Sequence, residues 1–292
     1  AGKWCSYSNT PDLPHDQREE DGGALTFTSE PLQETLEILG APTVDLELSS
    51  SQPVAMVAIR LSDMHPDNKV ARVTYGLLNL THRDSHSLPE PLVPGQRYRV
   101  RVQLNGVGQT FPRGHRIHVA ISTSYFPLAW PSPTSTQLTI HTGNCRLTLP
   151  ARQLRQEHIK FPDPEMTASG NKQQIQAGHH NWRVIRELDR DLSTLEVIND
   201  NGIYYLEDVD LTIEHRVSEW YTAQADNFGS VEGKTLCVRG YQRGDWRIRT
   251  VTRTALTCDE EHFYLNAELD AYEGPRRVFS KNWNRVIKRL LV

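Results

Sequence analysis

The feature that most constrains this chain is a two-residue alternation of apolar and polar side chains. It is clearest over residues 97–104, where the polar positions are Arg97, Arg99, Arg101 and Gln103 and the apolar ones are Tyr98, Val100, Val102 and Leu104. Successive side chains of a strand point to opposite faces, so this pattern predicts a strand with one buried face. The same period recurs at Val44/Leu46/Leu48, Ile117/Val119/Ile121, Leu138/Ile140 and Cys145/Leu147/Leu149.

Turn residues separate these predicted strands. Pro94-Gly95 and Pro112-Arg113-Gly114 have the composition of tight turns, and no convincing amphipathic helix precedes residue 150. Short strands with Pro and Gly breaks predict an all-β fold, here a jelly-roll β-sandwich of galactose-binding-like type over residues 43–151. Residues 1–42, with several prolines and a cluster of charges, are expected to be an irregular connecting segment.

Beyond the sandwich the pattern stops and then returns. Residues 152–178 are polar and contain prolines, which indicates a linker, and residues 179–292 alternate again and predict a second, antiparallel β domain. Within it Asp200-Asn201-Gly202 predicts a tight type I′ hairpin, because Asn-Gly tolerates positive φ. Arg243-Gly244-Asp245 spells an adhesion tripeptide, but a hairpin turn before the next strand is the favoured interpretation.

Composition excludes several classes of function. The 292 residues carry a formal net charge of −4, which argues against nucleic acid as a partner, and no apolar run or signal peptide points to a membrane. The four cysteines lie far apart without C-x-x-C pairs, so we expect four free thiols, no metal and no cofactor, in the cytoplasm. The chain opens at Ala1 without an initiator Met, which favours a fragment of a longer protein.

No residue has the setting of a catalytic nucleophile. Gly229-Ser230-Val231-Glu232-Gly233 has the wrong spacing for G-x-S-x-G and lies in a polar stretch, so no catalytic residue is assigned. His82 and His86 follow an apolar strand, where i and i+4 side chains would stand about 13 Å apart, too far to share a metal ion. His179-His180 at the edge of the linker is likewise expected to bind no metal.

The most unusual stretch is residues 122–133, which packs three aromatic side chains among three prolines directly after a predicted strand. A loop this apolar must be covered by something. It can cap the core of its own domain, or it can form a substrate-pocket rim or interdomain contact. We expect the second role for Tyr125, Phe126, Leu128 and Trp130. In the isolated chain we expect the loop to be unusually exposed or engaged in a contact with a neighbouring molecule.

At this level the chain resembles a known family. The resemblance is carried by Leu39-Gly40-Ala41-Pro42, Thr74-Tyr75-Gly76, Asn79-Leu80-Thr81-His82-Arg83, Phe111-Pro112-Arg113-Gly114-His115-Arg116-Ile117 and Ser122-Thr123-Ser124-Tyr125-Phe126-Pro127. Together these motifs, over residues 25–150, look like the C-terminal jelly roll of the cocaine-esterase and X-prolyl dipeptidyl peptidase hydrolases. Residues 180–292 resemble a β-rich extension found in a subgroup of them.

The resemblance implies a division of labour. In these bacterial hydrolases an α/β-hydrolase domain comes first and carries Ser, Asp and His, and the jelly roll follows the catalytic His. His15 does not match the motif of that His, so no catalytic residue is carried over. The implied partner is the N-terminal α/β-hydrolase domain of the same parent chain, which would hydrolyse esters, amides or X-Pro dipeptides through an acyl-enzyme.

Two other classes of function stay open. Jelly rolls often hold sugars on exposed aromatic side chains, and six Trp are available for a carbohydrate- or ligand-binding module. A structural or oligomerisation domain is the third class, and homo-oligomer formation is compatible with the sequence.

Overall fold

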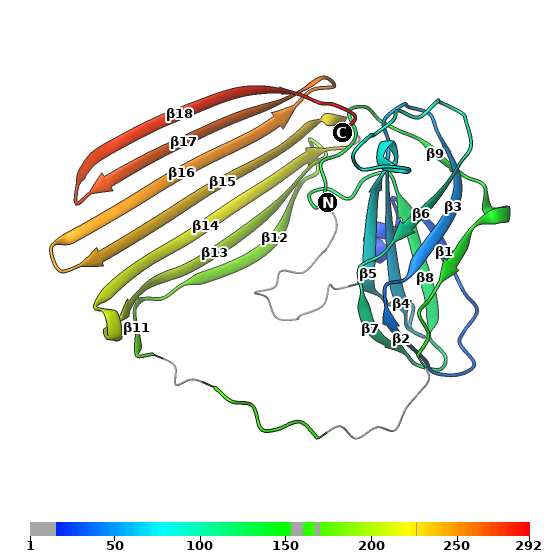
Figure 1. Cartoon of the computed structure of the whole chain (residues 1–292), viewed down its shortest axis with the longest axis horizontal. Helices are drawn as coiled ribbons and strands as arrows, with labels where there is room; N and C mark the ends of the chain where they lie inside the picture. The colour runs from blue at the N-terminus through cyan, green and yellow to red at the C-terminus, as the bar shows by residue number, and fades with distance from the viewer. Residues whose placement is uncertain (1–15, 153–159, 167–169, 226) are drawn as a thin grey trace. The chain divides into compact units, whose positions relative to one another are not determined.

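The computed structural model describes residues 16–152, 160–166, 170–225 and 227–292 (Figure 1). The chain divides into two compact units, Ala1–Gln156 with Leu290–Val292, and Glu157–Arg289. Both are built from antiparallel strands, so the expected all-β fold class is confirmed. Only short helices occur among the described residues, and none has the length and apolar character of a membrane span.

The first unit is the jelly-roll sandwich. Its main sheets have the strand orders β1-β8-β4-β5 and β10-β3-β6 with β9 also on β3, and β2 pairs with β7. The strands are β1 Leu25–Thr28, β2 Leu36–Gly40, β3 Thr43–Ser50, β4 Met56–Met64, β5 Val70–Asn79, β6 Tyr98–Gln103, β7 Val107–Phe111, β8 Arg116–Ser122, β9 Leu138–Ile140 and β10 Arg146–Thr148. The short helices are α1 Arg18–Asp21, η1 Leu80–His82 and η2 Thr142–Asn144.

The expected alternation describes the core of this unit well. In β6, Val100 and Val102 are buried while Arg99 and Arg101 are exposed, as the two-residue period predicts. The inward residues of β3 and β6 meet those of β4 and β8 in one apolar cluster that includes Leu48, Ile59 and Ile121. Burial of apolar surface between the two sheets is therefore the main force that holds the sandwich together.

The structure differs from the expected irregular segment over residues 1–42. Within the described part of it, β1 pairs with β8 and β2 pairs with β7, and Ile38 enters the core. The strand β1 lies at the edge of its sheet, and all four of its side chains are exposed. It is held there by backbone pairing with β8. A strand held by its backbone alone leaves no alternation of burial for the sequence to show. The last three residues, 290–292, also belong to this unit, and the Asn79 amide donates to the Leu291 carbonyl at 2.7 Å.

The second unit is one long antiparallel meander (Figure 1). Its 8-stranded sheet has the order β11-β13-β14-β15-β16-β17-β18, and β12 pairs with β13 beside β11. Its elements are β11 Lys172–Gln176, β12 His179–Glu187, β13 Leu192–Leu206, η3 Glu207–Val209, β14 Leu211–Gln224, β15 Asn227–Arg243, β16 Trp246–Cys258, β17 His262–Glu273 and β18 Arg276–Lys288. The strand β11 lies inside the range 152–178 expected to be a linker.

The predicted hairpin at Asp200-Asn201-Gly202 is wrong. Strand β13 continues through it, and the pairing with β14 shifts register between Asp200 and Ile203, as at a β-bulge. The positive φ of Gly202, +68°, serves this bulge rather than a chain reversal. By contrast, Arg243-Gly244-Asp245 does join β15 to β16, with Arg243 paired to Trp246.

Candidate functional site

The aromatic loop, residues 122–133, leaves the end of β8 and folds back onto the first unit. Tyr125 and Phe126 are only 7% and 5% exposed, whereas Leu128 and Trp130 are half-buried. Phe126 and Trp130 make an edge-to-face contact with ring centroids 5.7 Å apart. The expectation that this loop is unusually exposed in the isolated chain is therefore wrong for Tyr125 and Phe126, because those two side chains fill space in their own unit.

Polar contacts fix Tyr125 as well. Its hydroxyl accepts a hydrogen bond from Arg72, and its ring lies edge-on to Tyr75 with centroids 5.4 Å apart. The Arg72 guanidinium also lies over the Tyr75 ring, 5.1 Å from its centroid. Burial raises the pKa of Tyr125, with Arg72 acting in the opposite direction. The first half of the loop thus packs against β5 through Arg72 and Tyr75.

A groove of about 460 Å³ lies beside both ends of the loop. Its walls include Leu25 and Ile121, and its rim carries the hydroxyl-bearing residues Ser122, Thr123 and Thr136. None of the four predicted rim residues lines this groove. Within the loop, Tyr125 and Phe126 are buried, whereas Leu128 and Trp130 are half-buried, and the Trp130 ring packs edge-on against Phe126.

A hydroxyl, an imidazole and a carboxylate do meet elsewhere in the first unit. The Thr28 hydroxyl lies 2.7 Å from Nδ1 of the buried His118, and Asp21 lies 3.1 Å from its Nε2. Asp21 also accepts from the buried Arg60 at 2.8 Å, and Arg60 donates to Gln17 at 3.1 Å. Because this carboxylate already neutralises a buried guanidinium, the network anchors α1 to the sheet rather than activating Thr28.

The serine that most resembles a nucleophile in sequence is held within a sheet. Ser230 lies in β15, and its hydroxyl donates to the Asn227 carbonyl at 2.6 Å. A nucleophile elbow would place it on a sharp strand-to-helix turn instead. Ser230 therefore lies in a strand and not on such a turn.

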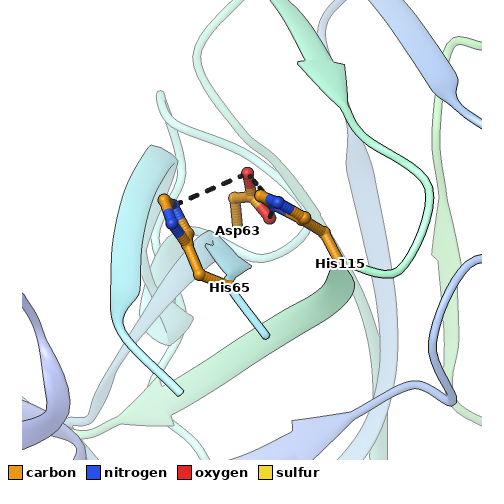
Figure 2. A group of neighbouring side chains, drawn as sticks. All are labelled: Asp63, His65 and His115. Carbon is orange, nitrogen blue, oxygen red and sulfur yellow. Dashed lines mark hydrogen bonds and ion pairs between the residues drawn. The ribbon is translucent and has the colours of Figure 1, made fainter. Parts of the chain in front are cut away.

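The structure brings together three metal-ligating side chains that the sequence analysis did not single out. Asp63, His65 and His115 each offer one ligand atom within 4.8 Å of the other two (Figure 2). A signal for this group was present in the sequence. The alternating apolar positions of β4 are followed by an acid, Asp63, and those of β8 are preceded by His115.

The spacing assumed for His82 and His86 was wrong. Their rings lie 5.5 Å apart between centroids, because η1 and the following turn replace the extended strand. Among the described residues, no carboxylate joins this pair in a three-ligand group.

Comparison with known proteins identifies the first unit. Residues 1–185, more than half of the chain, match the family model described as the X-Pro dipeptidyl-peptidase C-terminal non-catalytic domain. The chain belongs to this family.

The relatives that match part of this chain include hydrolases. A candidate serine esterase of Mycobacterium tuberculosis is 32% identical over 124 residues, which are 37% of this chain and 20% of that protein. Cocaine esterase of Rhodococcus sp. is 28% identical over 123 residues, 41% of this chain and 21% of the esterase. The chain therefore spans about a fifth of the length of these relatives.

A solved structure from the same group also matches. An α-amino acid ester hydrolase is 29% identical, with a TM-score of 0.46, over 48% of this chain and 28% of that enzyme.

Proposed function

We propose that this chain packs on an α/β-hydrolase domain of the same parent protein and shapes the acyl pocket of that domain. The parent would hydrolyse an ester, an amide or an X-Pro dipeptide through an acyl-enzyme, with the serine nucleophile supplied by the partner domain. The observation that carries the proposal is the aromatic loop: Tyr125 and Phe126 anchor it, while Leu128 and Trp130 are only half-buried and keep apolar surface accessible.

The two halves of the loop have separable roles in this proposal. Tyr125 and Phe126 hold the loop on its own unit, whereas Leu128 and Trp130 form the rim that meets substrate or the hydrolase domain. Half-buried apolar side chains of this kind lose their remaining contact with water only when a neighbouring surface packs on them. Removal of Leu128 or Trp130 should therefore act on substrate binding, and removal of Trp130 also deletes the edge-to-face contact with Phe126.

The test is a set of variants in the complete hydrolase. Trp130→Ala and Leu128→Ala should raise KM or change acyl-group preference by about tenfold, because one large apolar contact contributes about 1.5–3 kcal/mol when fully buried. Trp246→Ala, in the exposed position after the β15–β16 turn, is the matched control and should leave kinetics unchanged. Wild-type kinetics for both loop variants across several acyl groups would overturn the pocket-rim role.

A second candidate function rests on a depression of about 370 Å³ in the second unit. It is lined by Trp220 together with the polar side chains of Lys234, Asn266 and Glu268. The Trp220 indole donates to Glu196 at 3.0 Å, which orients the ring. An aromatic face bordered by amide and carboxylate groups suits a sugar, so a carbohydrate-binding module is the alternative. Titration with neutral oligosaccharides while following Trp fluorescence, with Trp220→Ala as the comparison, distinguishes it.

We also infer a cytoplasmic location. Cys145, Cys237 and Cys258 form no disulfide within the part of the chain that the structure describes, and Cys5 lies outside it. Free thiols suit a reducing compartment. Thiol titration of the unfolded chain without reductant should count four, and a count of two or none would contradict this inference.

A further inference from the structure

The group Asp63–His65–His115 lies where β4 ends and β8 begins (Figure 2). Asp63 is near the end of β4, and His65 begins the turn to β5. His115 immediately precedes β8, at the end of the turn from β7. The pairing of Met64 with Arg116 continues into this turn region and places His65 opposite His115, where the ring centroids are 4.8 Å apart.

The burial of Asp63 demands a cationic partner. Val57, Ile59 and Leu61 form the inward row of β4, and Asp63 continues the same row with only 5% of its surface exposed. A carboxylate in this position is stable only when it is paired or coordinates a metal ion. His115 supplies one contact, with Nδ1 at 2.9 and 3.0 Å from the two Asp63 oxygens, and His65 approaches with Nε2 at 4.0 Å.

The separations are close to those of a metal-bound group. Zinc bonds to nitrogen and oxygen are about 2.0–2.2 Å long, so tetrahedral ligand atoms stand about 3.3–3.5 Å apart. With a bound ion, the distance from His115 Nδ1 to the Asp63 oxygens would lengthen slightly. His65 Nε2 would move toward the other two ligand atoms by about 1 Å to reach tetrahedral spacing. The His65 side chain is 35% exposed, so it has the freedom to move and leaves a way in for the ion.

We propose that Asp63, His65 and His115 bind a divalent first-row transition metal ion, with Zn²⁺ as the representative. Two imidazoles and one carboxylate form a ligand set that such ions prefer, with water completing the coordination. The ion would join the β4–β5 turn to the β7–β8 turn. A simple ion pair between Asp63 and His115 is the competing account, and it gives His65 no role.

The test uses the whole chain, freed of metal with EDTA and then titrated with Zn²⁺ against a chromophoric chelator. The wild type should bind one more Zn²⁺ per chain than His65→Gln, or bind it at least about 100-fold more tightly, because loss of even an outer-shell partner costs about 10–100-fold in affinity. His82→Gln is the matched control: it removes a histidine from the pair that His82 forms with His86, without touching a three-ligand group. It should titrate like the wild type.

A stability measurement accompanies the titration. Zn²⁺ should raise the thermal midpoint of the wild type and of His82→Gln but not that of His65→Gln, since an ion that binds only the folded state stabilises it. Equal binding and equal midpoint shifts in the wild type and His65→Gln overturn the proposal.

A second measurement needs no variant. Diethyl pyrocarbonate should modify His65 in the metal-free wild type, and Zn²⁺ should slow that modification at least about tenfold while His82 reacts at an unchanged rate. The two rates are followed by peptide mass spectrometry. Equal rates at His65 with and without Zn²⁺ would refute the site even if a substituted chain failed to fold.

Discussion

Single side chains in this protein show how a β fold handles polar groups near its core. Glu47 lies on the core strand β3, and hydrogen bonding from the Asn144 amide at 2.7 Å lowers its pKa, with Arg97 adding to the effect. In the second unit, hydrogen bonds from Arg183 and from the Trp220 indole likewise lower the pKa of Glu196. In both cases the acid is kept ionised by donors aimed at it.

The first prediction concerns Ile59, which is fully buried between the sheets of the first unit. Ile59→Ala should destabilise the first unit by about 2–5 kcal/mol, because it removes buried methyl groups and leaves a cavity. Urea unfolding followed by circular dichroism measures this. Leu39→Ala, on the exposed side of β2, is the control and should stay within about 0.5 kcal/mol of the wild type. Equal losses in both variants would contradict the placement of the core.

The second prediction concerns Asp259 in the turn between β16 and β17. It accepts hydrogen bonds from the Tyr264 hydroxyl and the amides of Glu261 and His262, which lower its pKa to about 2. An unfolded Asp titrates near about 3.9. The folded pKa is the lower one, so this stabilisation is present above about pH 4 and is lost as pH falls toward 2.

Thermal unfolding of the wild type and Asp259→Asn checks that sign. The wild type should be the more stable protein at pH 6, and the difference between the two midpoints should shrink as pH falls from 4 to 2. A difference that stays constant over this range would show that the carboxylate charge contributes nothing to the turn.

At the scale of elements, the bulge in β13 decides how the second sheet begins. On one side of β13, β12 pairs up to Asp200 and β11 pairs from Ile203 onward. The bulge thus marks the point where the long strand β13 changes partner from β12 to β11. Asp200 stabilises the bulge by accepting a hydrogen bond from the Gly202 amide at 2.8 Å. The actual chain reversal into β13 occurs after Glu187, at the end of β12.

The third prediction follows from that geometry. A Cβ added at Gly202 would lie 2.0 Å from the Gln176 carbonyl oxygen, and its φ of +68° disfavours any other residue. Gly202→Ala should therefore destabilise the second unit by at least about 1–3 kcal/mol in urea unfolding. Gly229→Ala, whose Cβ would meet only Asn227 Oδ1 at 3.4 Å, is the control from the same sheet. Similar stability of the two variants would contradict the bulge.

At the scale of the whole molecule, the chain consists of two compact β units. The boundary between them falls in the polar, Pro-containing stretch that begins at residue 152. The second unit has its own continuous ladder from β11 to β18, and the strands of the first unit pair only with one another.

The fourth prediction is that limited proteolysis cuts first between residues 152 and 171. Exposed segments between domains are preferred sites of nicking, and β11 begins at Lys172. Gel electrophoresis and mass spectrometry of the early fragments should show two products that resist further cleavage. Early cuts within β6, Tyr98–Gln103, would contradict the boundary.

The fifth prediction is that the isolated chain does not turn over activated esters such as p-nitrophenyl acetate. The family is described as non-catalytic, and Ser230 is bonded within its sheet. The assay should show no rate above that of an inactive protein of similar composition. Turnover abolished by a serine-directed phosphonate would contradict this expectation.

The sequence by itself determined the all-β class, the inward residues of the sandwich strands and the turn at Gly244, because burial on one face of a strand imposes a two-residue period. It also determined the family resemblance. It did not reveal β1, whose side chains are all exposed and whose place is set by backbone pairing with β8.

Only the tertiary structure decided which residues meet across the sheets. Asn-Gly has the same local preference for positive φ in a hairpin and in a bulge. Here the bulge forms because β12 pairs with β13 before it and β11 pairs with β13 after it. Asp63 and His115 are 52 residues apart in sequence, and antiparallel pairing of β4 with β8 brings them into contact. Local propensity acts over a few residues, whereas register between distant strands is set by the packing of the whole core.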